Sequence, residues 1–306
     1  MPESSPTFSN RSTIGFMIVL SVISAFILSL MAAALRGKQA EARELDRTKE
    51  MLVAAQIYNP QGYFQIRQDG GYIPAKYVGD GMLVRGSSED RASDRDILAV
   101  VHARIEPFLV DDAGRQFSFE EKKIDMKRYL AENKKKGYAN LPLKIVYRVF
   151  PNPQKGERAK TPECYLIPIS GFGLWDYMYG YLALAPDGDD VIGISWYEQK
   201  ETPGLGGTVS EYWWQQLFRG KKIFQPDAAG HTDFERAPIG ITIIKGKVKD
   251  VVGSSPKAAC CVDGMAGATL TGNGVSRAYK DSLSPYRPFF ISLHSLEEKG
   301  HAAAGL

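Results

Sequence analysis

The stretch from Asp263 to Val275 reads DGMAGATLTGNGV and is the most informative part of the chain. Small residues surround two hydroxyl side chains, Thr269 and Thr271, and four glycines let the backbone approach a ligand closely. A short helix is expected over residues 275–283, which places Thr271 just before a helix N-terminus. Free N–H groups and the helix dipole at such a terminus favour a phosphate. The stretch therefore predicts an anion-binding turn beside a hydroxyl, with a plain Gly-rich loop capped by threonine as the alternative.

Other catalytic and nucleotide-binding motifs do not fit this stretch. No Gly-Lys-Ser/Thr triplet makes it a Walker A loop, and it contains neither G-x-S-x-G nor the acidic residue that follows a Rossmann fingerprint. Four histidines without metal-ligand spacing predict no metal site, and they provide no base for a serine or threonine hydrolase. We therefore predict no catalytic residue, and no enzyme activity of the chain alone.

The composition is that of a globular protein. Of 306 residues, 44% are hydrophobic and 24% are charged, which allows a sizeable core and excludes wholesale disorder. The net charge of +3, from 38 basic and 35 acidic residues, is too balanced to indicate a nucleic-acid partner. Three cysteines without a C-x-x-C pair exclude a disulfide scaffold and a zinc ribbon.

An uncharged segment near the N-terminus predicts a membrane anchor. After a short tail (residues 1–11), residues 12–35 contain no charged side chain and are mostly apolar. As a helix these residues extend over about 36 Å, enough to cross a hydrocarbon core of about 30 Å. The alternative is a cleaved secretory signal, although the apolar run is longer than a typical signal peptide has. We predict a single-pass membrane protein.

Charge alone favours a cytoplasmic position for the large C-terminal part. One basic residue precedes the span, whereas Arg36, Lys38 and three more basic residues follow it closely. Long domains, however, cross membranes largely regardless of flanking charge, so this argument for orientation is weak.

The region after the anchor predicts a helix and then a mixed segment. Residues 36–62 form a juxtamembrane unit, with a helix over 40–56 that continues from the anchor and ends before Tyr58–Gly62. Residues 63–150 form a mixed, membrane-proximal region with a solvated helix over 120–136 and a strand over 143–150. The Pro/Lys-rich loop 151–162 is the predicted domain boundary.

The C-terminal part predicts a compact α+β domain over residues 163–290, followed by a tail (291–306). Residues 181–185 and 191–197 form a predicted hairpin around an Asp-rich turn, which is interpreted as a plain turn rather than a calcium loop. Ser210 is predicted to cap a helix carrying two tryptophans, which are expected to pack in the core or on a membrane surface. A strand is expected over 238–247, and Cys260 and Cys261 are expected to be free or buried.

Residues 266–271, AGATLT, resemble the flavinylation motif of FMN-binding domains, written S/T-G-A-T/S-x-T. Ala266 replaces the first hydroxyl residue of the motif, but the last threonine, Thr271, is retained. Residues 201–206, ETPGLG, resemble a second block of the same family, and Gln199 stands where a histidine often precedes it. Two motifs in the right order are more specific than either alone.

The resemblance implies covalent FMN, linked by a flavin transferase to Thr271 through a phosphoester. On this interpretation, Thr269 and the backbone N–H groups of Gly272, Asn273 and Gly274 lie around the phosphate. Four residues are predicted to lie near the isoalloxazine ring, namely Trp175, Glu201, Thr202 and Leu205. FMN can pass electrons one at a time, so the implied role is electron transfer.

Within that family, the chain most resembles the C subunits of Na⁺-translocating NADH:quinone reductases. This implies a bacterial inner-membrane protein with a periplasmic flavin domain, which carries electrons from NADH towards quinone in a complex that exports Na⁺. The implied partners are the other membrane subunits. Two alternatives remain: the flavinylated subunit of a ferredoxin:NAD electron transport complex, and a membrane-anchored interaction domain without redox function.

Overall fold

The computed structural model describes residues 10–153 and 161–304 and contains two compact units, Met1–Asp46 and Arg47–Leu306. The tail 1–11, the loop 151–162 and the tail 291–306 of the sequence prediction lie partly outside the described residues. Because the two units are not placed relative to one another, each is described by itself.

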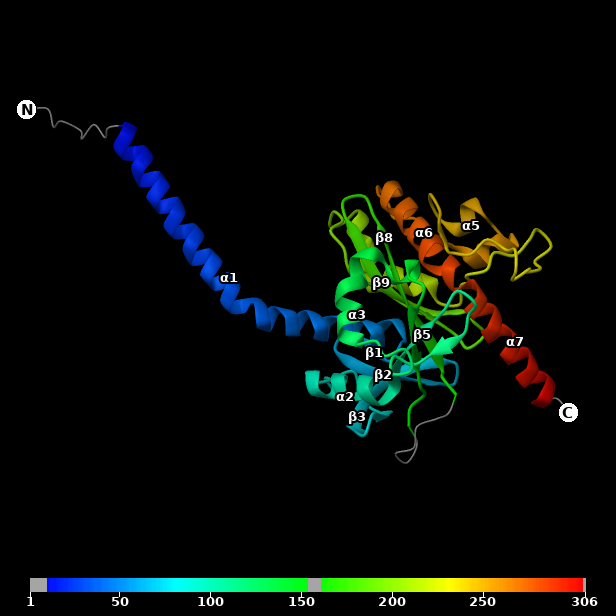
Figure 1. Cartoon of the computed structure of the whole chain (residues 1–306). Helices are drawn as coiled ribbons and strands as arrows, with labels where there is room; N and C mark the ends of the chain where they lie inside the picture. Colours follow the sequence, from blue (N-terminus) through cyan, green and yellow to red (C-terminus); the bar gives the residue numbers. More distant parts are fainter. Residues whose placement is uncertain (1–9, 154–160, 305–306) are drawn as a thin grey trace, which may run out of the picture. The chain divides into compact units, whose positions relative to one another are not determined.

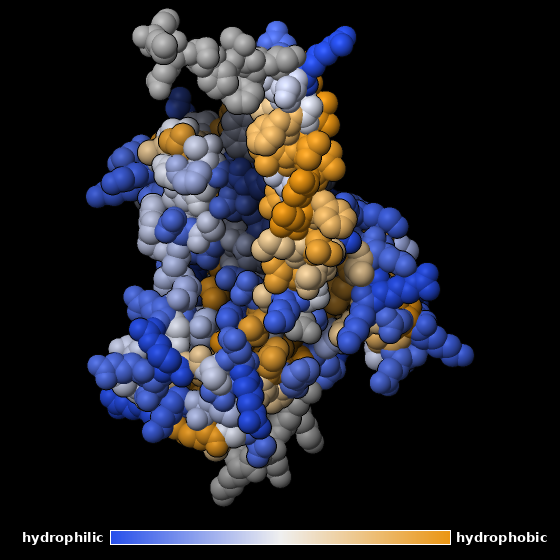
Figure 2. Space-filling view, turned by 90° about the vertical axis from the view of Figure 1, so that its left-hand side faces the viewer, coloured by the Kyte–Doolittle hydropathy of each residue, from blue (hydrophilic) through white to orange (hydrophobic). Residues whose placement is uncertain are grey.

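Helix α1 (Asn10–Ala54) contains the predicted anchor. Its residues Asn10–Gln39 are long and apolar enough to cross a membrane. The large apolar side chains between Ile14 and Leu35 are exposed and form a continuous orange column in Figure 2. An exposed apolar surface of this length is what a lipid-facing helix requires. The predicted span, residues 12–35, lies wholly within this segment.

The last turns of α1 belong to the second unit and are buried there. Leu52 and Val53 are almost fully buried. The helix ends at Ala54, two residues earlier than predicted, because Gln56 adopts a left-handed conformation (φ 57°) and Ile57 N–H bonds back to the Leu52 carbonyl. The chain then enters a strand rather than a loop at Tyr58.

A small antiparallel sheet follows, in the order β1-β2-β3-β4. Helix α2 comes next and begins with a capping box between Ser93 and Asp96. These elements are β1 (Tyr58–Asn59), β2 (Tyr63–Gln68), β3 (Gly71–Gly79), β4 (Met82–Arg85) and α2 (Asp94–Arg104).

The larger sheet has the order β10-β9-β8-β7-β5-β6, and all its neighbouring strands are antiparallel. Its strands are β5 (Ile105–Val110), β6 (Gln116–Phe117), β7 (Lys144–Val149), β8 (Cys164–Phe172), β9 (Tyr177–Leu184) and β10 (Val191–Glu198). The predicted strand 143–150 is confirmed as β7, and the predicted hairpin is confirmed as β9 and β10.

This sheet crosses the domain boundary predicted at residues 151–162. Val149 of β7 pairs with Cys164 of β8, so the loop connects two adjacent strands of one sheet. The Pro and Lys content of residues 151–162 predicts an exposed loop. Composition does not reveal that the strands before and after the loop, β7 and β8, pair in one sheet. The regions 63–150 and 163–290 are therefore not separate domains in this structure.

Helices α6 (Thr269–Leu283) and α7 (Arg287–Ala304) complete the core, and α6 lies alongside β8 (Figure 1). The contact between α6 and β8 is so close that a Cβ atom on Gly171 would overlap Ala278. Two hydrogen bonds tie the layers together: Trp196 Nε1 donates to the Tyr279 hydroxyl (3.2 Å), and the Tyr286 hydroxyl donates to the Ile145 carbonyl (3.0 Å).

The C-terminal tail predicted from residue 291 is a helix as far as Ala304. Phe289, Phe290 and Leu293 are buried in the core, and this apolar spacing is the signal of a helix face. The buried face begins before residue 291, so it is divided between the predicted domain and the predicted tail.

Several short elements differ from the prediction. The solvated helix expected over 120–136 is α3 (Met126–Asn133), capped by Asp125 and followed by one 3₁₀ turn. Ser210 does not cap α4 (Tyr212–Gln215); it ends a preceding 3₁₀ turn (Gly206–Ser210) and donates to the Gly207 carbonyl (2.9 Å).

The strand expected over 238–247 is reduced to β11 (Thr242–Ile243), parallel to β12 (Cys261–Val262). Glycines with positive φ at 240 and 246 bend the chain on both sides of it. The short helix α5 (Val248–Val251) follows.

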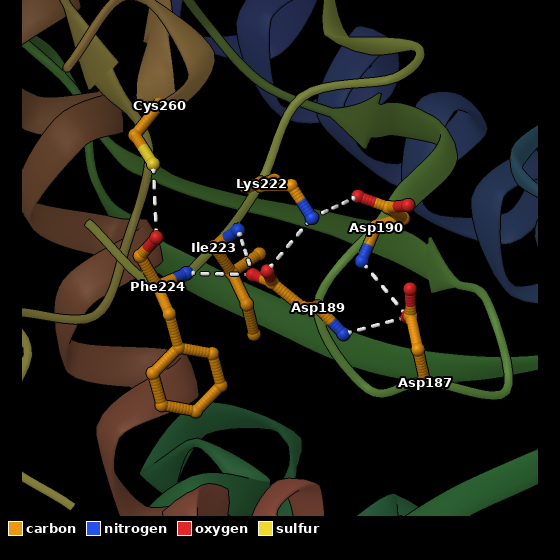
Figure 3. Close-up of polar contacts among 7 residues, drawn as sticks. All are labelled: Asp187, Asp189, Asp190, Lys222, Ile223, Phe224 and Cys260. Atoms are coloured by element: carbon orange, nitrogen blue, oxygen red, sulfur yellow. Dashed lines mark hydrogen bonds and ion pairs between the residues drawn. The ribbon is translucent and has the colours of Figure 1, made fainter. Parts of the chain in front are cut away.

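The Asp-rich turn between β9 and β10 is held by its own backbone (Figure 3). The Asp187 carboxylate accepts from the N–H groups of Asp189 and Asp190 (2.9 and 3.0 Å), which is an Asx turn. The buried Asp189 carboxylate accepts from Lys222 Nζ (3.1 Å) and from the N–H groups of Ile223 and Phe224. The turn is therefore joined to a segment more than 30 residues further along the chain.

Asp189→Ala tests this connection. The substitution leaves the buried N–H group of Phe224 without an acceptor, whereas Ile223 N–H still donates to the Asp189 carbonyl, so we expect a loss of about 2 kcal/mol of unfolding free energy. Asp190 pairs with the same lysine but is half exposed, and Asp190→Ala is expected to cost less than about 1 kcal/mol. Urea unfolding of the full chain in detergent measures both variants, and equal losses would contradict the account.

The three cysteines provide a second test. Cys164, Cys260 and Cys261 are free and buried. Burial raises the pKa of each thiol, to about 12 for Cys260. Because the thiolate is the reactive form, these thiols stay protonated and unreactive near pH 8. Titration with an aromatic disulfide reagent should detect almost no fast-reacting thiol in the folded chain and three after denaturation. Rapid reaction of the folded chain would overturn this prediction.

Candidate functional site

A cavity of about 630 Å³ lies beside the N-terminus of α6. One wall is the segment 263–268, and a second wall is the segment 243–247. Thr269 and Asn273 of α6 and Trp213 of the α4 region also contribute to the lining. The stretch singled out in the sequence therefore forms both a wall of this cavity and the start of the adjoining helix.

Hydrogen bonds hold the two walls together. Gly264 N–H donates to the Gly246 carbonyl (2.8 Å), and Asp263 Oδ1 accepts from Val248 N–H (2.7 Å). A Cβ atom on Gly264 would overlap the Ile244 carbonyl, so only glycine allows this approach. The Asp263 carbonyl also accepts from Trp214 Nε1 (3.2 Å), which ties the tryptophan pair to the same wall.

Helix α6 begins earlier than predicted, and this changes which groups face an anion. The cap residue is Ala268, Thr269 is the first helical residue, and Gly272 N–H already donates to the Ala268 carbonyl (3.0 Å). The N–H groups of Gly272, Asn273 and Gly274 are therefore used within the helix rather than offered to a phosphate. The groups that lack a carbonyl four residues back are those of residues 269–271.

The glycines mislead the prediction because they suggest a loop. Gly272 packs against Ile243, and a Cβ atom on Gly274 would lie 2.5 Å from the Phe172 carbonyl. In the structure these two glycines let α6 pack closely against Ile243 and Phe172, and they do not mark a flexible loop.

Thr271 and Thr269 point to different surroundings. Thr269 lines the cavity, whereas the Thr271 side chain is directed into the domain and is only 1% exposed. Thr271 Oγ1 donates to Glu201 Oε2 at 2.5 Å. The two sequence motifs, 70 residues apart, therefore meet in a buried hydrogen bond.

Glu201 is bound on both sides of its carboxylate. Oε1 accepts from the N–H groups of Leu174 (2.9 Å) and Trp175 (3.1 Å), while Oε2 accepts from Thr271. Its own N–H donates to Gln199 Oε1 (2.5 Å), the position where the family often has histidine. The sequence predicts Glu201 beside a flavin ring; in the structure it is 4% exposed and joins three segments of the chain.

Trp175, Thr202 and Leu205 form an exposed rim outside the cavity lining. Trp175 is 65% exposed and donates from Nε1 to Thr202 Oγ1 (3.2 Å). Leu205 is partly exposed and lies against Gly267. Beside them, the hydrogen bond from Lys200 lowers the pKa of the Asp176 carboxyl. The structure brings these predicted residues together, and their contact with a flavin stays a prediction.

Sequence reasoning misses several lining residues, above all Lys245 and Lys247. Trp213, for which core or membrane packing is predicted, is 62% exposed at the cavity. The sequence offers one signal for these lysines, because they stand two residues apart directly after a short apolar run that ends at Ile244. Nothing in the sequence, however, places that run beside the Gly-rich stretch.

Residues 173–284 match the family of FMN-binding domains. Over 297 residues the chain is 38% identical to the C subunit of the Na⁺-translocating NADH-quinone reductase of Chlamydia caviae, covering 94% of this chain and 93% of that protein. It is 30% identical to the protein of the same name from Vibrio parahaemolyticus, over 89% of each chain. The crystal structure of the C subunit from Parabacteroides distasonis has the same fold, with a TM-score of 0.52, 22% identity, and coverage of 84% of this chain and 96% of that one.

The chain thus belongs to the family of C subunits of Na⁺-translocating NADH-quinone reductases, and its cofactor is FMN. The cavity fits this group. It presents two lysines and a helix N-terminus for a phosphate, and an exposed tryptophan for a planar ring. Close approach to the backbone is possible because glycines occupy both walls.

Gly264→Ala tests the construction of the cavity. The new methyl group would overlap a backbone carbonyl, so we expect a loss of about 1–3 kcal/mol of unfolding free energy. Gly272→Ala is the matched control, because its methyl group meets the side chain of Ile243 at 3.2 Å, which can shift. Thermal unfolding should separate the two variants, and equal stability would show that the wall is not closely packed.

Proposed function

We propose that this chain is the electron-carrying subunit of a membrane-bound Na⁺-translocating NADH:quinone reductase. It holds FMN as a phosphoester on Thr271 and passes electrons from NADH towards quinone, in a complex that exports Na⁺. The observation that carries the proposal is the position of Thr271: it lies in the first turn of α6, within the segment that matches FMN-binding domains and beside the cavity.

FMN supplies one-electron transfer when it is bound. The chain supplies retention and position. The N–H groups of residues 269–271 and the side chains of Lys245 and Lys247 favour a phosphate, and the rim of Trp175 and Leu205 offers apolar contact to a ring. A covalent link retains the cofactor outside the cytoplasm, where a diffusing flavin is lost.

The position in the cell follows from the apolar part of α1. We propose that this segment anchors the chain in the bacterial inner membrane, and that the flavin domain faces the periplasm. The other membrane subunits of the reductase are the proposed electron partners, and a flavin transferase is the proposed maturation enzyme. The apolar segment has no ionisable side chain between residues 12 and 35, so the partners would provide the path for the ion.

Thr271→Ala tests the linkage. Coexpression with a flavin transferase, followed by denaturing electrophoresis, reports covalent flavin by its fluorescence. We expect the label to disappear in Thr271→Ala and to persist in Thr269→Ala, since only Thr271 provides the ester oxygen. Label retained on Thr271→Ala would contradict the assignment. Loss in both variants would mean that motif geometry, rather than the acceptor alone, had been disrupted.

A further inference from the structure

The contact between Glu201 and Thr271 has the form of a base beside a reacting hydroxyl. Thr271 Oγ1 is 2.5 Å from Glu201 Oε2, inside the domain, with both side chains less than 5% exposed. We propose that Glu201 accepts the hydroxyl proton of Thr271 when the phosphoester forms. This inference rests on the proposed function of Thr271 as the flavin acceptor.

The surrounding backbone makes room for this pair. A Cβ atom on Gly206 would lie 2.5 Å from Thr271 Oγ1 and 2.7 Å from Glu201 Oε2. A Cβ atom on Gly173 would overlap the other oxygen, Glu201 Oε1. Two glycines from separate segments therefore leave the space in which the Glu201 carboxylate reaches the Thr271 hydroxyl.

The carboxylate is fixed independently of the threonine. The N–H groups of Leu174 and Trp175 hold Oε1, and these belong to the turn between β8 and β9. The other oxygen, Oε2, accepts from the Thr271 hydroxyl. A base held in this way keeps its position as the acceptor reacts, and such preorganisation makes proton transfer efficient.

The chemistry balances with a flavin dinucleotide as donor. Thr271 Oγ1 forms a bond to the flavin-side phosphorus, and the pyrophosphate bond to the nucleoside monophosphate breaks. The hydroxyl proton moves to Glu201 Oε2 and leaves with the departing phosphate or to solvent. No oxidant or reductant takes part. Without an acceptor for that proton, a threonine hydroxyl is a weak nucleophile near neutral pH.

Because Thr271 is 1% exposed, a flavin donor reaches its hydroxyl only after a local movement of the structure. Residues 202–205 are exposed, and Gly204 has a positive φ of 75°, whereas Glu201 and Gly206 at the base of the loop are buried. The backbone donors that hold Glu201, those of Leu174 and Trp175, lie outside this loop, so a movement of its tip leaves them in place.

The test is Glu201→Gln in the full chain, purified in detergent without flavin and mixed with purified transferase and FAD. Glutamine has a single side-chain oxygen. If that oxygen accepts from Leu174 and Trp175, the NH₂ group faces Thr271 and accepts no proton. We expect labelling to be slower by about 10²-fold, the usual size of general-base catalysis. Glu198→Gln, which removes an exposed carboxylate three residues earlier, is the control and should label at the wild-type rate.

The pH profile separates a base from a structural contact. Hydroxide replaces a missing base, so the ratio of the wild-type rate to the Glu201→Gln rate should fall as pH rises from about 7 to about 9. The ratio cancels the pH dependence of the transferase. A purely structural loss would give a constant ratio.

Gly206→Ala provides a second variant in case Glu201→Gln does not fold. It keeps the carboxylate but separates it from the hydroxyl, and it should also slow labelling. Wild-type rates in a folded Glu201→Gln or Gly206→Ala chain, or a rate ratio that does not change with pH, would overturn the inference. Wild-type chain that takes no flavin, or takes it on another residue, would instead overturn the proposed function.

Discussion

The hydrogen bond from Thr271 to Glu201 is the contact that joins the two motifs of the segment that matches FMN-binding domains. It joins the first turn of α6 to the loop after β10, and through the other carboxylate oxygen it reaches the turn between β8 and β9. Each of these segments is held by the core, because α6 packs on β8 at Gly171 and Ala278. The position of the Thr271 hydroxyl therefore depends on the packing of the whole α+β unit.

Much of the fold follows from local sequence patterns. The apolar N-terminal helix, the strand β7 and the hairpin β9–β10 each correspond to an apolar run in the sequence, and all three elements are present. The predicted boundary at residues 151–162 fails because strand pairing is not local: composition marks an exposed loop but not the sheet that its two ends share. The helix α7 is missed in part because the expected domain limit divides its apolar face.

The site is predictable in its motifs and not in its contacts. The FMN-binding stretch and the ETPGLG block are recognisable in the sequence, and the structure places them together. Which atoms meet depends on packing. The glycines at 272 and 274 indicate a loop by propensity, yet both lie within α6, and at 274 the Phe172 carbonyl leaves no room for a side chain. Glu201 pairs with Thr271, and Lys245 lines the cavity beside the Gly-rich stretch. Both contacts join segments that are far apart in the sequence, and no local pattern predicts that such segments meet.

The central claim is that this chain carries FMN covalently on a threonine in the first turn of α6. The most direct measurement is tandem mass spectrometry of proteolytic peptides from the wild-type chain, purified from membranes of a host with an active flavin transferase. The account predicts that the peptide containing Thr271 is heavier by one FMN less one water, with fragment ions that place the increment on Thr271. Flavin released on denaturation, or an increment on a different residue, would contradict it.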